Sequence, residues 1–177
     1  MEEAFAARGL AAPRRLEGPP LVLADPRLAH TAGSDRLANA LAVDGPAVVV
    51  DAGTAVTLDL VAADGTYLGG FIAPGPRAAL AGLAQATAAL PGLLGEPVPI
   101  EPGVETLGAL SAGGWGLGVG GVDRLVRAAR AHPAVGASAV VWATGGWGAA
   151  WAEASDHEAI RRDPLLVHRG IRRWAAG

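Results

Sequence analysis

The sequence predicts an α/β domain built on a mixed β-sheet with flanking helices. Residues 47–50 form a continuous apolar run, which is typical of a central strand buried on both faces. Residues 55–62 alternate between apolar and polar side chains, which indicates a second strand. Alanine-rich segments with helical spacing follow, and the longest covers residues 105–131.

The elements before the first sheet strand are short. Residues 1–20 begin with a short helical fragment, and residues 21–24 form a short strand candidate. A helix is predicted over residues 34–43, because Ser34 can cap its start and the apolar side chains that follow, among them Leu37, share one face.

An antiparallel three-stranded meander is predicted over residues 47–72. The turn D51-A-G-T closes its first hairpin, and residues 66–72 form its third strand. A helix over residues 77–90 follows and is expected to stop at Pro91. A strand at 139–143, a helix at 147–154 and a C-terminal segment at 165–174 complete the predicted order β-β-β-α-α-β-α.

The long helix over residues 105–131 is unusually rich in glycine. Each glycine inside a helix costs about 1 kcal/mol relative to alanine. Very close packing against another backbone would offset this cost, and a break in the helix is the alternative. The run G116-L-G-V-G-G121 does not open a helix after a strand and lacks an acidic residue about 20 positions on, so we interpret it as helix packing, not as a dinucleotide site.

The composition excludes several kinds of site. All 14 positive residues are arginine, so a phosphate-binding loop ending in lysine and a lysine Schiff base are both excluded. The chain has no cysteine, which excludes disulfides, thiolate catalysis and cysteine metal sites. With net charge -3, no dense basic patch, no apolar leader and no run long enough to cross a membrane, we expect a cytoplasmic protein that binds neither nucleic acid nor membrane.

The turn D51-A-G-T is the first candidate site. The carboxylate of Asp51, at the end of a strand, can bind a cation. The backbone amides of Gly53 and Thr54, together with the threonine hydroxyl, can face phosphate oxygens. An ordinary hairpin turn with the aspartate as a local acceptor explains the same residues.

Two further turns are candidates. In G33-S-D-R36, Asp35 can act as a general base beside the anion-binding guanidinium of Arg36, or it can simply be an acidic residue favoured at a helix N-terminus. T144-G-G can bring backbone close to a flat ligand, or can be a plain strand-to-helix turn. The histidines have no metal-ligand spacing, and we expect surface or structural roles for them: His30, His132, His157 and His168.

Taken in order, these pieces resemble the type III pantothenate kinases from about residue 20 to the C-terminus. The matching segments are G33-S-D-R-L-A-N-A, V49-V-D-A-G-T-A-V-T-L-D, Y67-L-G-G-F-I-A-P-G, T87-A-A-L-P, E105-T and A143-T-G-G. Ser34 stands where the family usually has alanine. The resemblance implies membership of the superfamily of acetate and sugar kinases, heat-shock proteins and actin, with ribonuclease-H-like domains and a homodimer.

The resemblance also implies an activity. This family transfers the γ-phosphoryl group of ATP to the 4′-hydroxyl of pantothenate, giving 4′-phosphopantothenate, the first step of coenzyme A biosynthesis. It uses a divalent metal such as Mg²⁺ and a monovalent cation, K⁺ or NH₄⁺. A non-catalytic ligand-binding or regulatory protein on the same fold is the alternative function.

Residue roles follow from the same resemblance. Asp35 is the expected base that takes the proton of the pantothenate hydroxyl, and Asp51 is the expected ligand of the monovalent cation. The expected pantothenate-binding residues also include Gly33, Ser34, Arg36 and Thr106. The expected nucleotide-binding residues are Gly53, Thr54, Gly145 and Gly146.

One family motif is missing from the sequence. The D-x-G-N-T loop that holds the ATP phosphates in the family's first domain does not occur. We therefore expect residues 1–45 to be a remnant of a first domain with a hinge helix, and residues 46–177 to be the second domain. A start codon chosen too late is the favoured explanation, and a short paralogue or half of a split enzyme are the others. Little or no kinase activity is expected of this chain alone.

Overall fold

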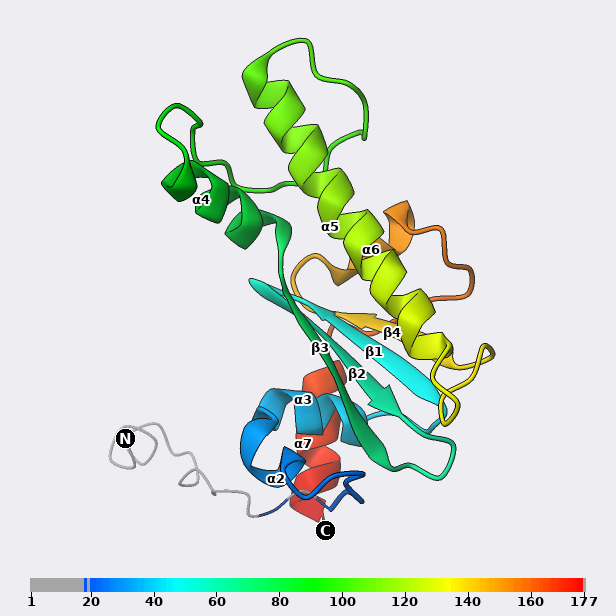
Figure 1. Ribbon diagram of the computed structural model, residues 1–177. Coiled ribbons are helices and arrows are strands. Elements are labelled where there is room, and N and C mark those ends of the chain that lie inside the picture. The colour runs from blue at the N-terminus through cyan, green and yellow to red at the C-terminus, as the bar shows by residue number, and fades with distance from the viewer. Residues whose placement is uncertain (1–17, 19, 177) are drawn as a thin grey trace, which may run out of the picture.

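The computed structural model describes residues 18 and 20–176 and contains a five-stranded mixed sheet. The predicted helical fragment near the start of the chain lies outside these residues. The strand order is β3-β2-β1-β4-β5 (Figure 1). β1 pairs antiparallel with β2, and β2 antiparallel with β3, while β4 runs parallel to both β1 and β5. The strands are β1 (Ala47–Ala52), β2 (Ala55–Val61), β3 (Tyr67–Pro74), β4 (Val140–Thr144) and β5 (Arg161–Arg162).

Helices cover both faces of this sheet. Helices α3 and α7 pack on one face and α5 and α6 on the other, whereas α4 and the first half of α5 extend beyond the sheet (Figure 1). None of the described helices is long and apolar enough to cross a membrane. The helices are α2 (Leu28–Thr31), α3 (Ser34–Leu41), α4 (Pro76–Ala86), α5 (Thr106–Arg130), α6 (Gly148–Ala154) and α7 (Leu166–Ala176).

The side chains of β1 alternate between two hydrophobic cores. Val48 and Val50 face the core under α5 and α6, and Val49 faces the core under α3 and α7. Because successive side chains of a strand point to opposite faces, Asp51 lies on the same side as Val49. The pleat therefore directs Asp51 toward α3.

The glycines of α5 do not break the helix. Added side chains at Gly114 and Gly118 would come within 2.8 Å of Leu80 and 2.7 Å of Pro76, both in α4. At Gly116 the nearest atom belongs to the side chain of Ile100. The expected packing against another backbone is thus wrong for these three positions, because the small residues admit side chains of α4 and the following loop.

Other boundaries differ modestly from the prediction. Helix α4 ends at Ala86, well before Pro91, and Thr87 takes an extended conformation while its hydroxyl donates to the carbonyl of Leu83 (2.9 Å). The strand expected at residues 21–24 is reduced to a single bridge between Leu23 and Tyr67. The short elements α2 and β5 were not predicted from the sequence.

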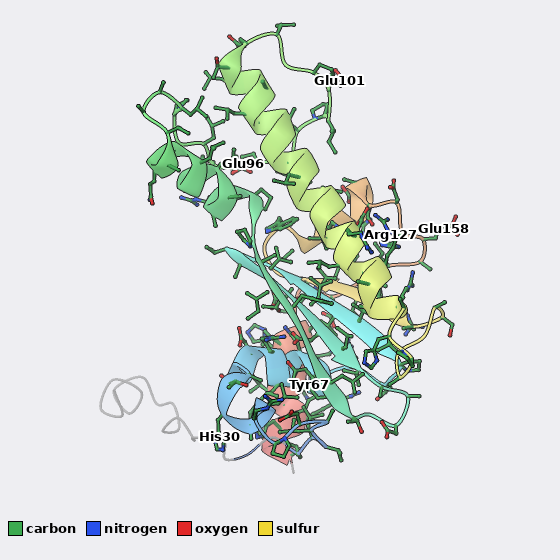
Figure 2. All side chains as sticks on the ribbon, in the orientation of Figure 1. His30, Tyr67, Glu96, Glu101, Arg127 and Glu158 are labelled. Carbon is green, nitrogen blue, oxygen red and sulfur yellow. The ribbon has the colours of Figure 1, made fainter. Side chains whose placement is uncertain are left out.

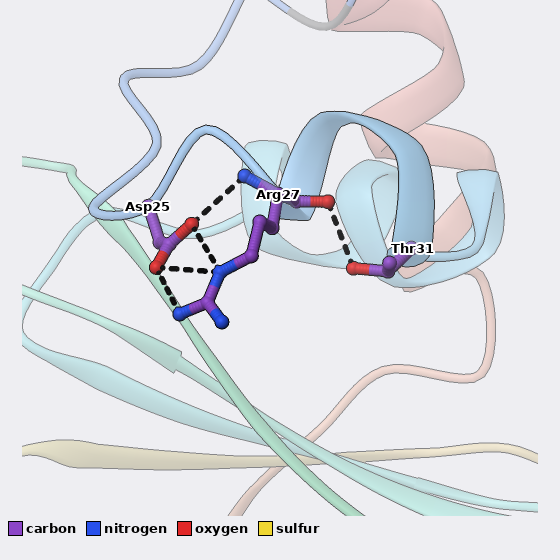
Figure 3. A network of polar contacts seen from close by, with 3 residues as sticks. All are labelled: Asp25, Arg27 and Thr31. Carbon is purple, nitrogen blue, oxygen red and sulfur yellow. Dashed lines mark hydrogen bonds and ion pairs between the residues drawn. The ribbon is translucent and has the colours of Figure 1, made fainter.

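The segment before α3 is fixed by a local ion pair. The guanidinium and backbone N–H of Arg27 both donate to the carboxylate of Asp25, and the Thr31 hydroxyl donates to the Arg27 carbonyl (Figure 3). The hydrogen bonds from Arg27 lower the pKa of Asp25 to about 2. These contacts shape the turn that leads into α3.

Candidate active site

The segment G33-S-D-R36 forms the start of α3. Gly33 is the residue before the first turn, and Asp35 lies in that turn with an exposed side chain. The N-terminal end of a helix favours a negative charge. A side chain at Gly33 would collide with the Asp35 carboxylate, so glycine keeps this carboxylate accessible. The arrangement suits a base that must meet a bound hydroxyl group.

Arg36 points away from solvent toward a buried carboxylate. Its Nε donates to Oδ1 of Asp59 over 2.8 Å, and its Nη2 lies 2.7 Å from the same oxygen. Tyr67 donates its hydroxyl to Oδ1 as well (2.7 Å), and the Thr57 hydroxyl lies 3.3 Å from Oδ2. Figure 2 shows Tyr67 below the sheet beside α3 and α7. Neither Asp59 nor Tyr67 was predicted as part of a site.

Burial governs the protonation of this cluster. Desolvation raises the pKa of the Asp59 carboxyl, although Arg36 and Tyr67 oppose the shift. Desolvation also raises the pKa of the Tyr67 phenol above its ordinary value, with Asp59 adding to the effect. Burial disfavours the charge on Arg36, but the attraction of Asp59 outweighs it and raises the pKa of Arg36. Burial and the Arg36 guanidinium therefore act in opposite directions on the Asp59 carboxyl, and the phenol that donates to it stays neutral.

Asp51 lies where three segments meet. The buried amide of Asn39, in α3, donates from Nδ2 to Oδ2 of Asp51 over 2.9 Å. Gly145 has φ +85°, and a side chain there would come within 2.5 Å of Oδ1 of Asp51. The register pairs Asp51 with Thr144, so the D-A-G-T and T-G-G turns lie at the same end of the sheet. Asn39 was not predicted, and its Oδ1 finds no partner among the described residues.

A pocket of about 360 Å³ opens next to these turns. It brings together three predicted nucleotide-binding residues, Gly53, Thr54 and Gly146, and it lies at the lower end of the range for small-molecule sites. Trp147 donates from Nε1 to the Gly53 carbonyl (2.8 Å), which fixes the turn. The remaining lining residues are Pro76, Arg77, Leu94, Gly95, Glu96, Pro97 and Trp147, and Figure 2 labels Glu96 near α4.

Thr106 does not join the other predicted site residues. It is exposed at the start of α5, and Figure 1 shows that end of the helix at the opposite end of the molecule from α3. Within the described part of the chain, no three His, Asp or Glu side chains gather as a metal-binding cluster. His30, His132 and His168 are exposed, and His157 contacts the carbonyl of Asp123 through Nε2 (3.1 Å).

Comparison with known proteins identifies the class of this α/β chain as a kinase family. The family model for type III pantothenate kinase matches residues 22–128. The chain is 35% identical to a protein from Rhodospirillum rubrum named type III pantothenate kinase, over 88% of this chain and 68% of that protein. The chain belongs to the type III pantothenate kinase family.

Two further relatives carry the same name. The protein from Frankia alni is 38% identical over 88% of this chain and 61% of its own length, and that from Paramagnetospirillum magneticum is 40% identical over 77% and 56%. The chain therefore spans between about half and two-thirds of the length of these relatives. A solved Campylobacter jejuni structure, assigned to the Baf family of transcriptional activators, has a TM-score of 0.61 and 25% identity, covering 99% of this chain and 76% of that one.

Proposed function

We propose that this chain serves the ATP-dependent phosphorylation of pantothenate to 4′-phosphopantothenate, the first step of coenzyme A biosynthesis. The observation that carries the proposal is the position of α3 between two predicted sites. Asp35 and Asn39 are one helical turn apart on the same face of α3, and Asn39 contacts Asp51 at the end of β1. The proposed base and the proposed cation ligand would thus lie on neighbouring elements.

The chemistry needs positioning and charge neutralisation more than covalent help. In the proposed reaction Asp35 takes the proton of the attacking hydroxyl group, while Gly33, Ser34 and Arg36 bind the pantothenate. Gly53 and Thr54 face the nucleotide phosphates, and Gly145 and Gly146 approach the adenosine. These roles are carried by the resemblance and supported by the shared pocket of Gly53, Thr54 and Gly146.

The donor set at Asp51 suits a monovalent cation. Oδ1 of Asp51 faces Gly145 while Oδ2 accepts from Asn39, so this site offers a hard carboxylate oxygen, and the described residues form no acidic cluster around it. We propose that Asp51 holds K⁺ or NH₄⁺, and that Mg²⁺ enters mainly with the ATP phosphates, as is usual for this ion. When bound, these cations neutralise charge on the transferring phosphoryl group.

For the fold, we propose a ribonuclease-H-like domain of the actin-like ATPase kind over residues 46–177. Its support is the order β3-β2-β1-β4-β5, in which three consecutive antiparallel strands, a meander, are extended by two parallel ones. Residues 1–45, with α3 as a hinge helix, would be the remnant of a first domain. We propose the cytoplasm as its location, where ATP is available.

We also propose that the chain acts as a homodimer. The separation of Thr106 from Asp35 supports this, because a second copy can supply Thr106 to a site from which this copy's own residue is remote. The apolar groove of about 310 Å³ between α4 and α5 offers a surface for that contact, with Leu117 71% exposed.

Calorimetric titration of the full chain with ATP and with pantothenate, separately, tests the function. We expect both ligands to bind, and potassium to strengthen ATP binding relative to sodium. Thr54→Ala should weaken only ATP binding, and Arg36→Ala only pantothenate binding. If the folded chain binds neither ligand, a non-catalytic protein on the same fold is the better description.

A further inference from the structure

Asp59 is a fully buried carboxylate for which the proposed reaction has no direct use. It lies on β2 and faces α3. Its Oδ1 accepts hydrogen bonds from Arg36 Nε (2.8 Å) and from the Tyr67 hydroxyl (2.7 Å). A buried carboxylate is strongly destabilising unless it is paired and hydrogen-bonded. The pairing with Arg36 is therefore a fixed part of the fold.

This pairing restricts Arg36, whose side chain is only 12% exposed. The hydrogen bond from Nε to Asp59 fixes one side of the guanidinium. Because the guanidinium is planar and rigid, this also fixes the direction of its other N–H groups. Nη2 is itself buried and lies 2.7 Å from Oδ1 of Asp59, so it faces this carboxylate and not the solvent. Only the small part of the guanidinium that stays exposed can donate to a bound molecule.

We propose that Asp59 and Tyr67 are positioning residues for the phosphoryl-acceptor site. They fix the guanidinium of Arg36 so that the part of it that stays exposed donates to an oxygen atom of the acceptor, an anionic small molecule that carries a hydroxyl group. The inference rests on the proposed function, which makes this acceptor pantothenate. Asp59 and Tyr67 act through Arg36 and do not touch the acceptor themselves.

A purely structural role makes a different prediction. If the cluster only ties α3 to the sheet, loss of Asp59 or Tyr67 lowers stability and weakens every ligand alike. If it positions Arg36, the loss acts on the acceptor alone. Tyr67→Phe removes only the hydroxyl and keeps the buried ring, so this variant tests the proposal even where Asp59→Asn folds poorly.

A double-mutant cycle on the full chain provides the test, with pantothenate and ATP affinities measured by calorimetry. Asp59→Asn and Arg36→Lys should each weaken pantothenate binding about tenfold or more, as expected for a misplaced hydrogen bond to a charged group. The double variant should bind no worse than Arg36→Lys, since Asp59 acts only through Arg36. Tyr67→Phe should weaken pantothenate binding in the same direction, and ATP affinity should stay unchanged throughout.

The matched control is Asp163→Asn. Asp163 is a partly buried carboxylate, 16% exposed, and its ion pair with Arg169 has a length of 2.5 Å. This pair does not involve Asp59, Arg36 or Tyr67. This variant should lower the unfolding temperature without changing pantothenate affinity. In the wild-type chain, nuclear magnetic resonance should show the Nε–H of Arg36 protected from exchange, and Asp59→Asn should remove that protection.

The outcomes separate this inference from the function on which it rests. Additive losses of pantothenate affinity in the cycle, or equal losses of ATP affinity, contradict the positioning role. Neither result contradicts the proposed function. A folded wild-type chain that binds no pantothenate contradicts the proposed function, and the acceptor role of Arg36 fails with it. Fast exchange of the Arg36 Nε–H in the wild type would by itself contradict the hydrogen bond through which Asp59 holds Arg36.

Discussion

Two adjacent glycines in the T-G-G turn have opposite tolerance for a side chain. Gly145 has φ +85°, and an added side chain would lie 2.5 Å from Asp51 and 2.6 Å from the backbone of Ala52. Gly146 has open space around it and no positive φ. We predict that Gly145→Ala lowers the free energy of unfolding by at least about 1–3 kcal/mol, the cost of a strained backbone residue. Urea denaturation measures this loss.

Gly146→Ala is the matched control for that prediction. It should change the free energy of unfolding by less than about 0.5 kcal/mol, as is usual for a substitution at an open surface position. Because Gly146 lines the proposed nucleotide pocket, ATP affinity can still fall in this variant. Equal stability loss in both variants would show that the turn does not enclose Asp51 as described.

The raised pKa of Asp59 predicts a pH dependence of stability. The folded protein keeps this proton to higher pH than the unfolded chain does, because burial disfavours the charge. The stabilising contribution of Asp59 is therefore complete below its ordinary pKa and is lost as the pH rises through the folded value. Urea unfolding between pH 4 and pH 7 should show the wild type losing stability relative to Asp59→Asn.

Asp25 provides a control of opposite sign. Arg27 lowers the pKa of Asp25 to about 2, so its contribution is present above the ordinary pKa and is lost as the pH falls toward 2. The wild type should therefore lose its advantage over Asp25→Asn on acidification. The same slope for both carboxylates would contradict the assignment of burial as the cause at Asp59.

At the residue scale the sequence predicts ends of elements better than buried polar contacts. Asp35 and Asp51 could be proposed because a helix start and a strand end are visible in the local pattern. Asp59 and Asn39 could not, because their partners are 23 and 12 residues away in the chain. Alternation placed Asp59 on the polar face of its strand, but only tertiary packing covers that face with α3.

At the element scale, α5 contains glycines of two kinds. An added side chain at Gly118 would lie 2.7 Å from the Pro76 ring, whereas Gly113 and Gly120 meet nothing within 4 Å. We predict that Gly113→Ala and Gly120→Ala each stabilise the chain by about 1 kcal/mol through helix propensity. Gly118→Ala should destabilise it by about 1–3 kcal/mol through overpacking against α4.

Thermal and urea unfolding at several protein concentrations test this division. If Gly120→Ala also destabilises the chain, and more so at high concentration, this side of α5 packs against a second copy. A loss that does not depend on concentration would mean that the described surroundings of Gly120 are wrong.

The elements themselves followed closely from the sequence. Strands β1 and β2 could be predicted because a buried run and a two-residue alternation are both local patterns, and α5 because its apolar face persists over many turns. The end of α4 was wrong because the backbone of Thr87 is already extended before the proline that was expected to stop the helix. The two-residue strand β5 exists only through its pairing with β4, which no local pattern reveals.

At the scale of the whole molecule, the position of Thr106 sets the strongest requirement. It starts α5 at the end remote from α3, so a pantothenate site that contains both Thr106 and Asp35 needs two copies of the chain. The exposed Leu117 lies in the apolar groove between α4 and α5 and is the best single position at which to disturb such a contact.

We predict that Leu117→Arg converts a dimer into a monomer, because a buried unpaired charge in an apolar interface is strongly unfavourable. Light scattering should give twice the chain mass of 17.6 kDa for the wild type and the single mass for the variant. Pantothenate affinity should fall about tenfold or more with the lost Thr106 contact, while ATP still binds. Leu165→Arg, at a 59% exposed position next to α7, should leave mass and affinity unchanged. A monomeric wild type that binds pantothenate would remove Thr106 from the site.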